Sequence, residues 1–201
     1  EQRGFSYMKD APLDMRMNQN QYLTAFNVVN EYSVAQLKKV LYEYGEERLA
    51  SKIAERIAKV RDQESIRTTR QLEKIVEECY PEKIRWKYGH PAKRTFQAIR
   101  IEVNGELENL DAALYTLARR LKAGGRMAVI SFHSLEDRIV KNVFKDLETD
   151  CICDKSLPKC VCGKVKEAKI LTKKPLEAGA EELEKNPRAQ SAKLRIIEKI
   201  G

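Results

Sequence analysis

Four polar or aromatic residues stand in a row where an apolar run ends: Ser131, Phe132, His133 and Ser134. An imidazole accepts or relays a proton near neutral pH, and serine hydroxyls can hydrogen-bond a polar substrate. A phenylalanine ring can stack on a flat ring of a ligand. The row therefore offers Ser131, His133 and Ser134 as candidate catalytic residues. The alternatives are His133 bonded to the strand end or to an RNA phosphate, Ser134 as a helix cap, and Phe132 within a core.

The surrounding sequence predicts a strand that leads into a helix. A Gly-Gly turn precedes an apolar run from Met127 to Phe132, and Ser134-x-x-Asp137 has the pattern of a helix N-terminus. A strand that turns into a helix places its last side chains at the carboxyl edge of a sheet, where α/β proteins bind ligands. We therefore expect the four residues at a binding edge.

Asp14 and Arg16 form a second candidate group, in a segment without clear helical periodicity. The carboxylate of Asp14 can accept a hydrogen bond from an amino group of a substrate, which makes it a further candidate catalytic residue. The guanidinium of Arg16 can bind a phosphate through two hydrogen bonds. The alternative is an ion pair between two residues of one loop.

The other candidate RNA contacts are Lys93, Arg94 and Arg100, on a helix that Pro91 is expected to begin, and Arg188 in a loop. The chain has 38 Lys and Arg residues against 30 Asp and Glu, a net charge of +8. That surplus suits a polyanionic partner, because phosphates bound by cations release their counterions. A solvated basic face is the competing explanation, and the charge alone does not decide between the two.

Four of the five cysteines form two Cys-x-Cys pairs, Cys151 with Cys153 and Cys160 with Cys162. Four thiolates around one tetrahedral ion would make a structural zinc site, although Cys-x2-Cys is the more usual spacing. Free or redox-labile thiols are the alternative. Because the sequence shows no export signal, we expect a cytoplasmic protein whose cysteines are reduced. Cys79 follows an apolar helical stripe and is expected to be buried.

Apolar periodicity divides the chain into a helical first part and a mixed second part. After an irregular stretch over residues 1–20 with a short helix near Asn18, helices are expected at about 33–45, 46–61, 68–80, 91–103 and 106–121. A strand at 127–132, a helix from 134, a strand at 168–172, a short acidic helix and a strand at 194–200 follow. No apolar run approaches the ~20 residues that span a bilayer, so no membrane partner is expected.

Several blocks of this sequence, in order, resemble those of the ribosomal RNA small subunit methyltransferase H family, which methylates N4 of a cytidine in 16S rRNA. They are residues 3–6 (RGFS) with 12–17 (PLDMRM), 90–100 (HPAKRTFQAIR), 130–141 (ISFHSLEDRIVK) and 186–195 (NPRAQSAKLR). The resemblance implies an α/β fold. Residues 101–201 would form the second half of a Rossmann-like S-adenosylmethionine-dependent methyltransferase domain, with its last strand inserted antiparallel. Residues 1–100 would form an all-helical insertion domain for RNA or substrate recognition. The implied partner is 16S rRNA in the small ribosomal subunit, and the implied cofactor is S-adenosyl-L-methionine.

The glycine-rich loop with which that family holds S-adenosylmethionine has no counterpart here, since the nine glycines include no Gly-x-Gly. We therefore expect no cofactor-binding residue in this chain. We expect it to be about the carboxyl-terminal two-thirds of the enzyme, with the cofactor pocket in the missing amino-terminal part. Two other functions stay open: a non-catalytic rRNA-binding fragment and a zinc-stabilised ribosome-assembly factor. The sequence does not fix the oligomeric state, and a homodimer is compatible with it.

Overall fold

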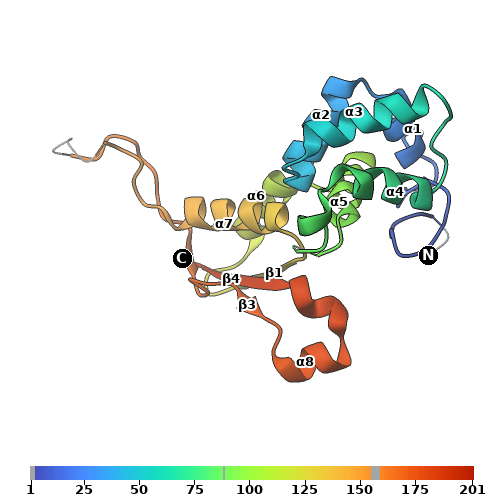
Figure 1. Cartoon of the computed structure of the whole chain (residues 1–201). Coiled ribbons are helices and arrows are strands. Elements are labelled where there is room, and N and C mark those ends of the chain that lie inside the picture. The colour runs from blue at the N-terminus through green and yellow to red at the C-terminus, as the bar shows by residue number, and fades with distance from the viewer. Residues whose placement is uncertain (1–2, 88, 155–158) are drawn as a thin grey trace. The chain divides into compact units, whose positions relative to one another are not determined.

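The computed structural model of the chain describes residues 3–87, 89–154 and 159–201. They form two compact units that divide after Glu106, and Figure 1 shows the helices and strands of both. Each unit has its own hydrophobic core. The first unit is helical: α1 (Ala25–Glu31), α2 (Val34–Gly45), α3 (Ala50–Arg61), α4 (Thr69–Cys79), the 3-10 helix η1 (Glu82–Ile84) and α5 (Ala92–Asn104). The second unit is mixed: α6 (Leu110–Arg120), β1 (Arg126–Ser131), α7 (Ser134–Glu148), β2 (Ala168–Ile170), β3 (Leu176–Glu177), α8 (Ala180–Lys185), the 3-10 helix η2 (Pro187–Ser191) and β4 (Lys193–Lys199).

Three helices of the first unit begin with the same reciprocal cap. Thr24, Ser33 and Thr68 precede α1, α2 and α4, and each side chain accepts a hydrogen bond from the backbone N–H three residues on. An amide side chain at that third position bonds back to the backbone N–H of the capping residue. Each box therefore provides hydrogen-bond acceptors for two backbone N–H groups that have no partner within the helix. The boxes at Ser33 and Thr68 confirm the two helix starts predicted there. The short helix expected near Asn18 is wrong, because residues around Asn18 form turns and α1 begins only after Thr24.

The helices α2 and α5 pack against each other, and Gly45 at the end of α2 permits a close approach. A Cβ atom at Gly45 would lie 2.9 Å from the carbonyl oxygen of Arg94 and 3.2 Å from Cβ of Ala98. Leu37 and Leu41 of α2 are completely buried in the core of the first unit. Each such side chain contributes roughly 1.5–3 kcal/mol through the apolar surface it removes from water.

The segment before α1 is fastened to the start of α4. The hydroxyl of Thr69 donates to the backbone carbonyl of Lys9 (2.8 Å) and accepts from the backbone N–H of Ala11 (3.0 Å). Thr69 is completely buried, so this two-way contact satisfies a polar group that would otherwise destabilise the interior. Asp14 and Arg16 thus stand on an anchored piece of chain.

The strands β1, β2 and β3 each pair with β4, and each of these pairs is antiparallel. β4 lies between β1 and β2, and β3 pairs with the beginning of β4. In the register of β1 with β4, Ser131 is opposite Lys193 and Arg126 is opposite Glu198. Because β1 and β2 both run opposite to β4, they run parallel to each other with the last strand between them. The antiparallel insertion of the last strand is therefore confirmed, whereas β3 was not expected.

The helix α7 covers this sheet, and an ion pair is buried between them. Val140, Phe144 and Leu147 of α7 share a core cluster with Ile197 of β4. Nε and Nη2 of Arg195 donate to the two carboxylate oxygens of Asp137 at 2.7 and 2.9 Å. The two side chains are only 10% and 12% exposed.

Some helices begin or end away from the expected residue. The second predicted helix starts at Ala50 rather than near residue 46, because Glu46 adopts a left-handed backbone conformation with φ of 48°. The division expected after residue 100 falls inside α5, which continues to Asn104. In the described ranges, no helix combines the length and the apolar character that crossing a membrane requires.

Candidate functional site

The junction between β1 and α7 is closed by two residues that bond to each other's backbone. His133 is the N-cap of α7, and its Nδ1 accepts a hydrogen bond from the backbone N–H of Glu136 (3.4 Å). The carboxylate of Glu136 accepts in return from the backbone N–H groups of Phe132 (2.8 Å) and His133 (3.3 Å). This is a capping box in which a histidine takes the place of serine or threonine.

The same box fixes the tautomer of His133. Nδ1 needs its lone pair to accept the N–H of Glu136, so the neutral ring carries its proton on Nε2. Nε2 lies 3.4 Å from Oε1 of Glu136, and the histidine side chain is only 6% exposed. Because Nδ1 is engaged in the helix cap, the ring is fixed in orientation, which favours a positioning role for His133. Its role as a proton acceptor stays a prediction.

The other three residues of the row have different surroundings. Ser131 is buried, and its hydroxyl donates to the backbone carbonyl of Lys193 on β4 (3.4 Å). Phe132 is 54% exposed, so the alternative that placed its ring in a core is wrong. Ser134 is exposed as the first residue of α7. The strand end therefore presents Phe132 and Ser134 to solvent, while Ser131 and His133 hold the backbone behind them.

The predicted cap of α7 is wrong by one residue. The pattern Ser134-x-x-Asp137 suggested Ser134, but the box is formed by His133 and Glu136, and Asp137 pairs with Arg195. Sequence reasoning therefore missed Glu136 as a site residue. Its signal was a carboxylate three residues after His133, which was overlooked because histidine is not among the preferred N-cap residues.

Asp14 and Arg16 form an ion pair through two hydrogen bonds. Nε and Nη2 of Arg16 donate to Oδ1 and Oδ2 of Asp14, each at 2.8 Å. Nη1 of Arg16 donates to the backbone carbonyls of Gln19 and Gln21, each at 2.9 Å. The hydrogen bond from Arg16 holds the pKa of the Asp14 carboxyl below its usual range. The pair is the loop ion pair foreseen as the alternative, and a contact of either residue with RNA stays a prediction.

Lys93 and Arg94 lie exposed in the first turn of α5. Nη1 of Arg94 donates to the backbone carbonyl of Glu46 (3.4 Å), and Nε2 of Gln97 donates to that of Tyr44 (3.2 Å). Both carbonyls belong to the end of α2, where donors are needed because the helix leaves its last C=O groups unpaired. Among the side chains that the structure describes, none pairs with the ammonium group of Lys93.

Arg100 is paired with a carboxylate, whereas Arg188 is not. Nε and Nη2 of Arg100 donate to the two carboxylate oxygens of Glu106 at 2.8 and 2.9 Å. Arg188 is exposed in η2, and no carboxylate pairs with it within the described ranges. Lys93 and Arg188 are therefore the predicted RNA contacts whose charge is best placed to meet a phosphate.

His90, the second histidine of the chain, is arranged like the first. Its Nδ1 accepts from the backbone N–H of Ala92 at the start of α5 (3.2 Å), and its Nε2 lies 3.1 Å from Oε1 of Glu73. Glu77 lies 3.6 Å from the same nitrogen, and the ring of Tyr7 stacks on the imidazole at 4.1 Å. Sequence reasoning missed the two glutamates, whose signal was their four-residue spacing on one helix.

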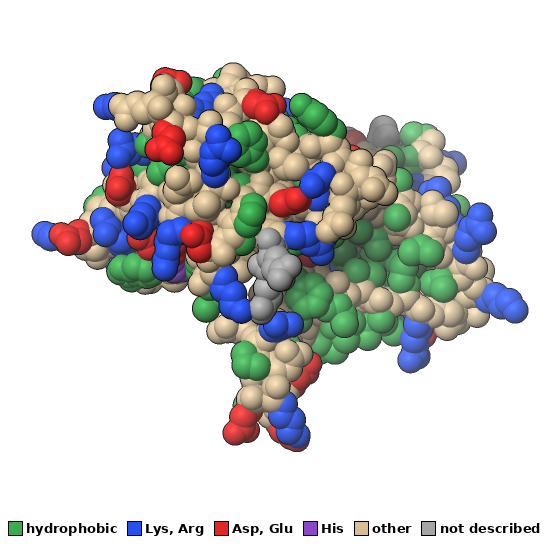
Figure 2. Space-filling model, turned by 90° about the vertical axis from the view of Figure 1, so that its right-hand side faces the viewer, with side chains coloured by type: hydrophobic (Ala, Val, Ile, Leu, Met, Phe, Trp, Pro, Cys, Tyr) green, Lys and Arg blue, Asp and Glu red, His purple; other side chains and the backbone are tan. Residues whose placement is uncertain are grey.

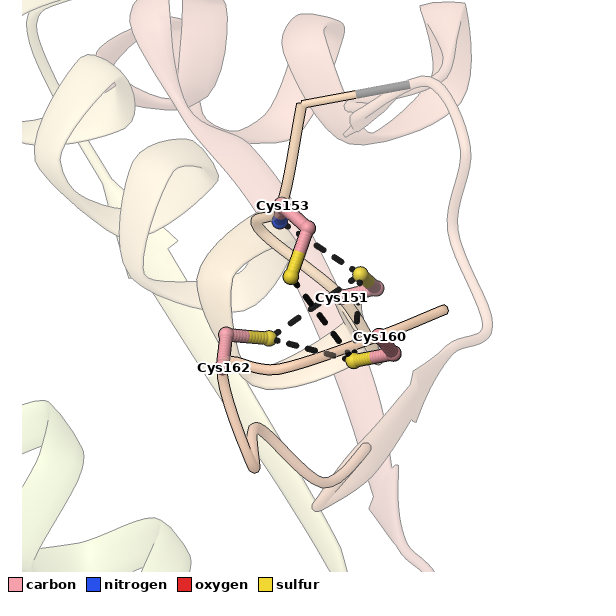
Figure 3. A group of neighbouring side chains, drawn as sticks. All are labelled: Cys151, Cys153, Cys160 and Cys162. Atoms are coloured by element: carbon pink, nitrogen blue, oxygen red, sulfur yellow. Dashed lines mark hydrogen bonds between the residues drawn. The ribbon is translucent and has the colours of Figure 1, made fainter. Parts of the chain in front are cut away.

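The four thiols of the Cys-x-Cys pairs converge in the loop between α7 and β2 (Figure 3). All four cysteines are free. Hydrogen bonds from the backbone N–H groups of Ile152 and Lys164 lower the pKa of Cys162 to about 6. Cys79, in the first unit, is buried as expected.

The candidate residues are divided between the two units. Asp14, Arg16, Lys93, Arg94 and Arg100 belong to the first unit, and Ser131, His133, Ser134 and Arg188 belong to the second. On the face drawn in Figure 2, Lys and Arg side chains are dispersed, with acidic side chains among them.

Comparison with known proteins gives consistent matches over the whole chain. A model of the MraW methylase family matches residues 1–200. The ribosomal RNA small subunit methyltransferase H of Caldicellulosiruptor saccharolyticus is 57% identical over 200 residues, which cover 99% of this chain and 64% of that protein. The protein of the same name from Clostridium botulinum (strain Kyoto / Type A2) is 55% identical over 198 residues, or 98% and 64% of the two chains. The one from Halothermothrix orenii is 51% identical over 199 residues, or 99% and 64%. The chain thus spans 64% of the length of these relatives.

Proposed function

Because this chain belongs to the MraW methylase family, we propose that it takes part in the S-adenosylmethionine-dependent N4-methylation of a cytidine in 16S rRNA. The residues of this chain bind the RNA that accepts the methyl group. That RNA is part of the small ribosomal subunit, and the reaction takes place in the cytoplasm. The β-sheet with α7 is the second half of a Rossmann-like domain, and the helical first unit is an insertion that contacts RNA. The names of the similar proteins support this assignment, since each is called a ribosomal RNA small subunit methyltransferase H.

The observation that carries the acceptor role is the exposed ring of Phe132 at the end of β1. An enzyme that acts on a base must take the base out of its stack and hold it against a flat partner. Phe132 offers such a surface where the strand ends, and Ser134 offers a hydroxyl within two residues of it. We assign the stacking of the cytosine ring to Phe132 and a polar contact with the base edge to Ser134.

The residues behind Phe132 keep the ring in place. Glu136 binds the backbone N–H of Phe132 itself, and His133 caps the helix that follows. Ser131 ties the strand end to β4 through its hydroxyl. A ring on a backbone fixed from both sides loses little freedom when a base binds, which strengthens the binding. We therefore assign positioning roles to His133, Glu136 and Ser131.

The cofactor does not fit the strand end described here. The backbone N–H groups of Phe132 and His133, which could donate to the carboxylate of S-adenosylmethionine, already bond to the Glu136 carboxylate. The turn after β1 also has no glycine to admit a ligand close to the backbone. We propose that S-adenosylmethionine is held by protein outside these 201 residues. Calorimetric titration of the cofactor into the chain should then give no binding heat, and saturable one-to-one binding would overturn this part of the proposal.

The acceptor role is tested by binding the chain to small ribosomal subunits from cells that lack the methyltransferase. Stacking on an aromatic side chain contributes about 1–3 kcal/mol per base, so Phe132→Ala should weaken binding by about 5- to 150-fold. Leu117→Ala is the matched control, because Leu117 is also exposed (56%) but lies on α6. The control should bind like the unchanged chain, and large ribosomal subunits should bind both variants equally.

Salt dependence separates base contacts from phosphate contacts. Lys93→Ala and Arg188→Ala should each reduce the slope of log affinity against log salt by about 0.7–0.9 per lost phosphate contact. Phe132→Ala should leave that slope unchanged, because its ring carries no charge. Equal affinity of the unchanged chain and Phe132→Ala for the small subunit would refute the acceptor role of this strand end.

A further inference from the structure

Four sulfur atoms in the second unit point toward a common centre (Figure 3). The Sγ atoms of Cys151 and Cys160 are 3.5 Å apart, as are those of Cys160 and Cys162. The Cys153–Cys160 and Cys151–Cys162 distances are both 3.9 Å. All four sulfurs lie within 4.8 Å of one another, although they come from two segments of the chain.

These distances are those of sulfurs around a metal ion. Zinc binds four thiolates tetrahedrally with Zn–S bonds of ~2.3 Å, which places the sulfurs about 3.8 Å apart. A disulfide would bring two sulfurs to ~2.05 Å. The observed spacing matches the edge of a ZnS4 tetrahedron and is far longer than a sulfur–sulfur bond.

Backbone N–H groups surround the sulfurs in a reciprocal pattern. The residue inside the first pair, Ile152, donates its N–H to Cys162 (3.5 Å), and the residue inside the second pair, Val161, donates to Cys153 (3.3 Å). The N–H of Cys153 donates to Cys151 (3.4 Å). Four thiolates around one divalent ion leave a net charge of −2, and such N–H donors disperse it and orient the ligands.

The loop has no apolar core of its own to hold this arrangement together. Ile152, Val161 and Val165 are 68%, 78% and 74% exposed. Neither core cluster includes a described residue between Thr149 and Glu167. In Figure 1 the described parts of the loop run away from the end of α7. A segment that buries so little apolar surface needs another source of order, and a metal can supply it.

We propose that Cys151, Cys153, Cys160 and Cys162 bind one zinc ion that orders this loop. All-sulfur coordination selects a soft or borderline ion over magnesium or calcium, and a tetrahedral set without a water position is typical of a structural site. The proposal rests on the sulfur geometry and not on the proposed function, so it can fail while the RNA role stands, or the reverse.

Contacts at the base of the loop limit the effect of the metal to the loop itself. The backbone N–H of Glu167 donates to the carbonyl of Leu147 (2.8 Å), and the ammonium of Lys164 donates to Asp146 (2.8 Å). These bonds join the loop to the end of α7 without the cysteines. Loss of zinc should therefore release the loop and leave the sheet folded.

The direct test is the zinc content of the purified chain under reducing conditions. We expect one zinc per chain by elemental analysis, and a tetrahedral thiolate absorption spectrum after exchange with cobalt. Chelation should speed amide hydrogen exchange at Ile152 and Val161 and leave exchange in β4 unchanged. A chain that contains no zinc and takes none up would overturn the proposal, and so would bound iron or a pair of disulfides.

Variants connect the metal to these cysteines. Cys153→Ser should weaken zinc binding by more than about 100-fold, measured in competition with a chromophoric chelator. Loss of a residue that only hydrogen-bonds to a metal ligand typically weakens binding 10–100-fold, so loss of a ligand should have a larger effect. Cys79→Ala is the matched control, since it removes the fifth thiol of the chain from the first unit. The control should keep one zinc per chain. Equal zinc affinity in Cys153→Ser and the unchanged chain would refute the assignment.

Discussion

Removing one partner of the buried ion pair between Asp137 and Arg195 should destabilise the second unit strongly. In Asp137→Ala the guanidinium of Arg195 stays between α7 and β4 without its two hydrogen bonds, and its side chain is only 10% exposed. Breaking a buried pair in this way costs about 3–5 kcal/mol, because the remaining charge is uncompensated. Arg126→Ala breaks a pair with Glu198 on the same sheet, but Arg126 is 67% exposed, so we expect a cost of about 0–1 kcal/mol.

A double variant tells an unpaired charge from lost packing. Asp137→Leu combined with Arg195→Met replaces both charged groups by apolar ones of similar size. Such replacements are often neutral or stabilising by about 1–4 kcal/mol, because no desolvated charge remains. The double variant should therefore be close to the unchanged chain in stability, although it lacks the same two hydrogen bonds.

Amide hydrogen exchange measures this stability in each unit separately. A loss of about 3–5 kcal/mol should speed exchange of the β1 and β4 amides by about 150- to 4,500-fold, while amides of α2 in the first unit serve as an internal reference. If Asp137→Ala speeds exchange no more than Arg126→Ala does, the reasoning from burial is refuted. It is equally refuted if the double variant is as unstable as Asp137→Ala.

Two further changes test other parts of the fold. The hydrogen bonds from Arg195 hold the pKa of Asp137 below its usual range, so its stabilising effect is complete above pH ~4 and is lost as the pH falls through the lower folded pKa. Protection of the sheet amides, followed from pH 5 downward, should show this loss in the unchanged chain and not in the double apolar variant. Gly4→Ala should destabilise the first unit by at least about 1 kcal/mol, because Gly4 has φ of 70° and an added Cβ would collide with the carbonyl oxygen of Pro12. Gly124→Ala is the control, because Gly124 also has a positive φ but no described atom lies within 4 Å of its added carbon. It should destabilise the second unit by less than Gly4→Ala destabilises the first. Equal losses of stability would exclude the collision as the cause.

Local signals in the sequence were sufficient for many elements. Ser33 and Thr68 cap their helices through partners three residues away, so a short window contains the whole interaction. The strand predicted at 127–132 and the one predicted at 194–200 appear as β1 and β4, each shifted by about one residue. Both carry runs of apolar residues that a short window also displays.

Contacts between distant residues could not be predicted in this way. Asp137 and Arg195 are 58 residues apart, and the sequence shows that both are charged but not that they meet. The predicted zinc site depended on whether two Cys-x-Cys pairs would converge, which spacing alone left open. His133 was singled out for its chemistry, yet its contact with Glu136 follows from a cap that sequence preferences do not favour.

The central place of β4 in the sheet also affects how the chain folds during synthesis. Lys199 follows Ser131 by 68 residues, and β1, β2 and β3 all pair with β4 and with no other strand in the described ranges. At 5–20 residues per second, a ribosome needs roughly 3–14 s to make β4 after completing β1. Through that interval the earlier strands have exposed edges, which favour association between nascent chains. The helices of the first unit need no such delay, because all their residues have been made before β1 emerges.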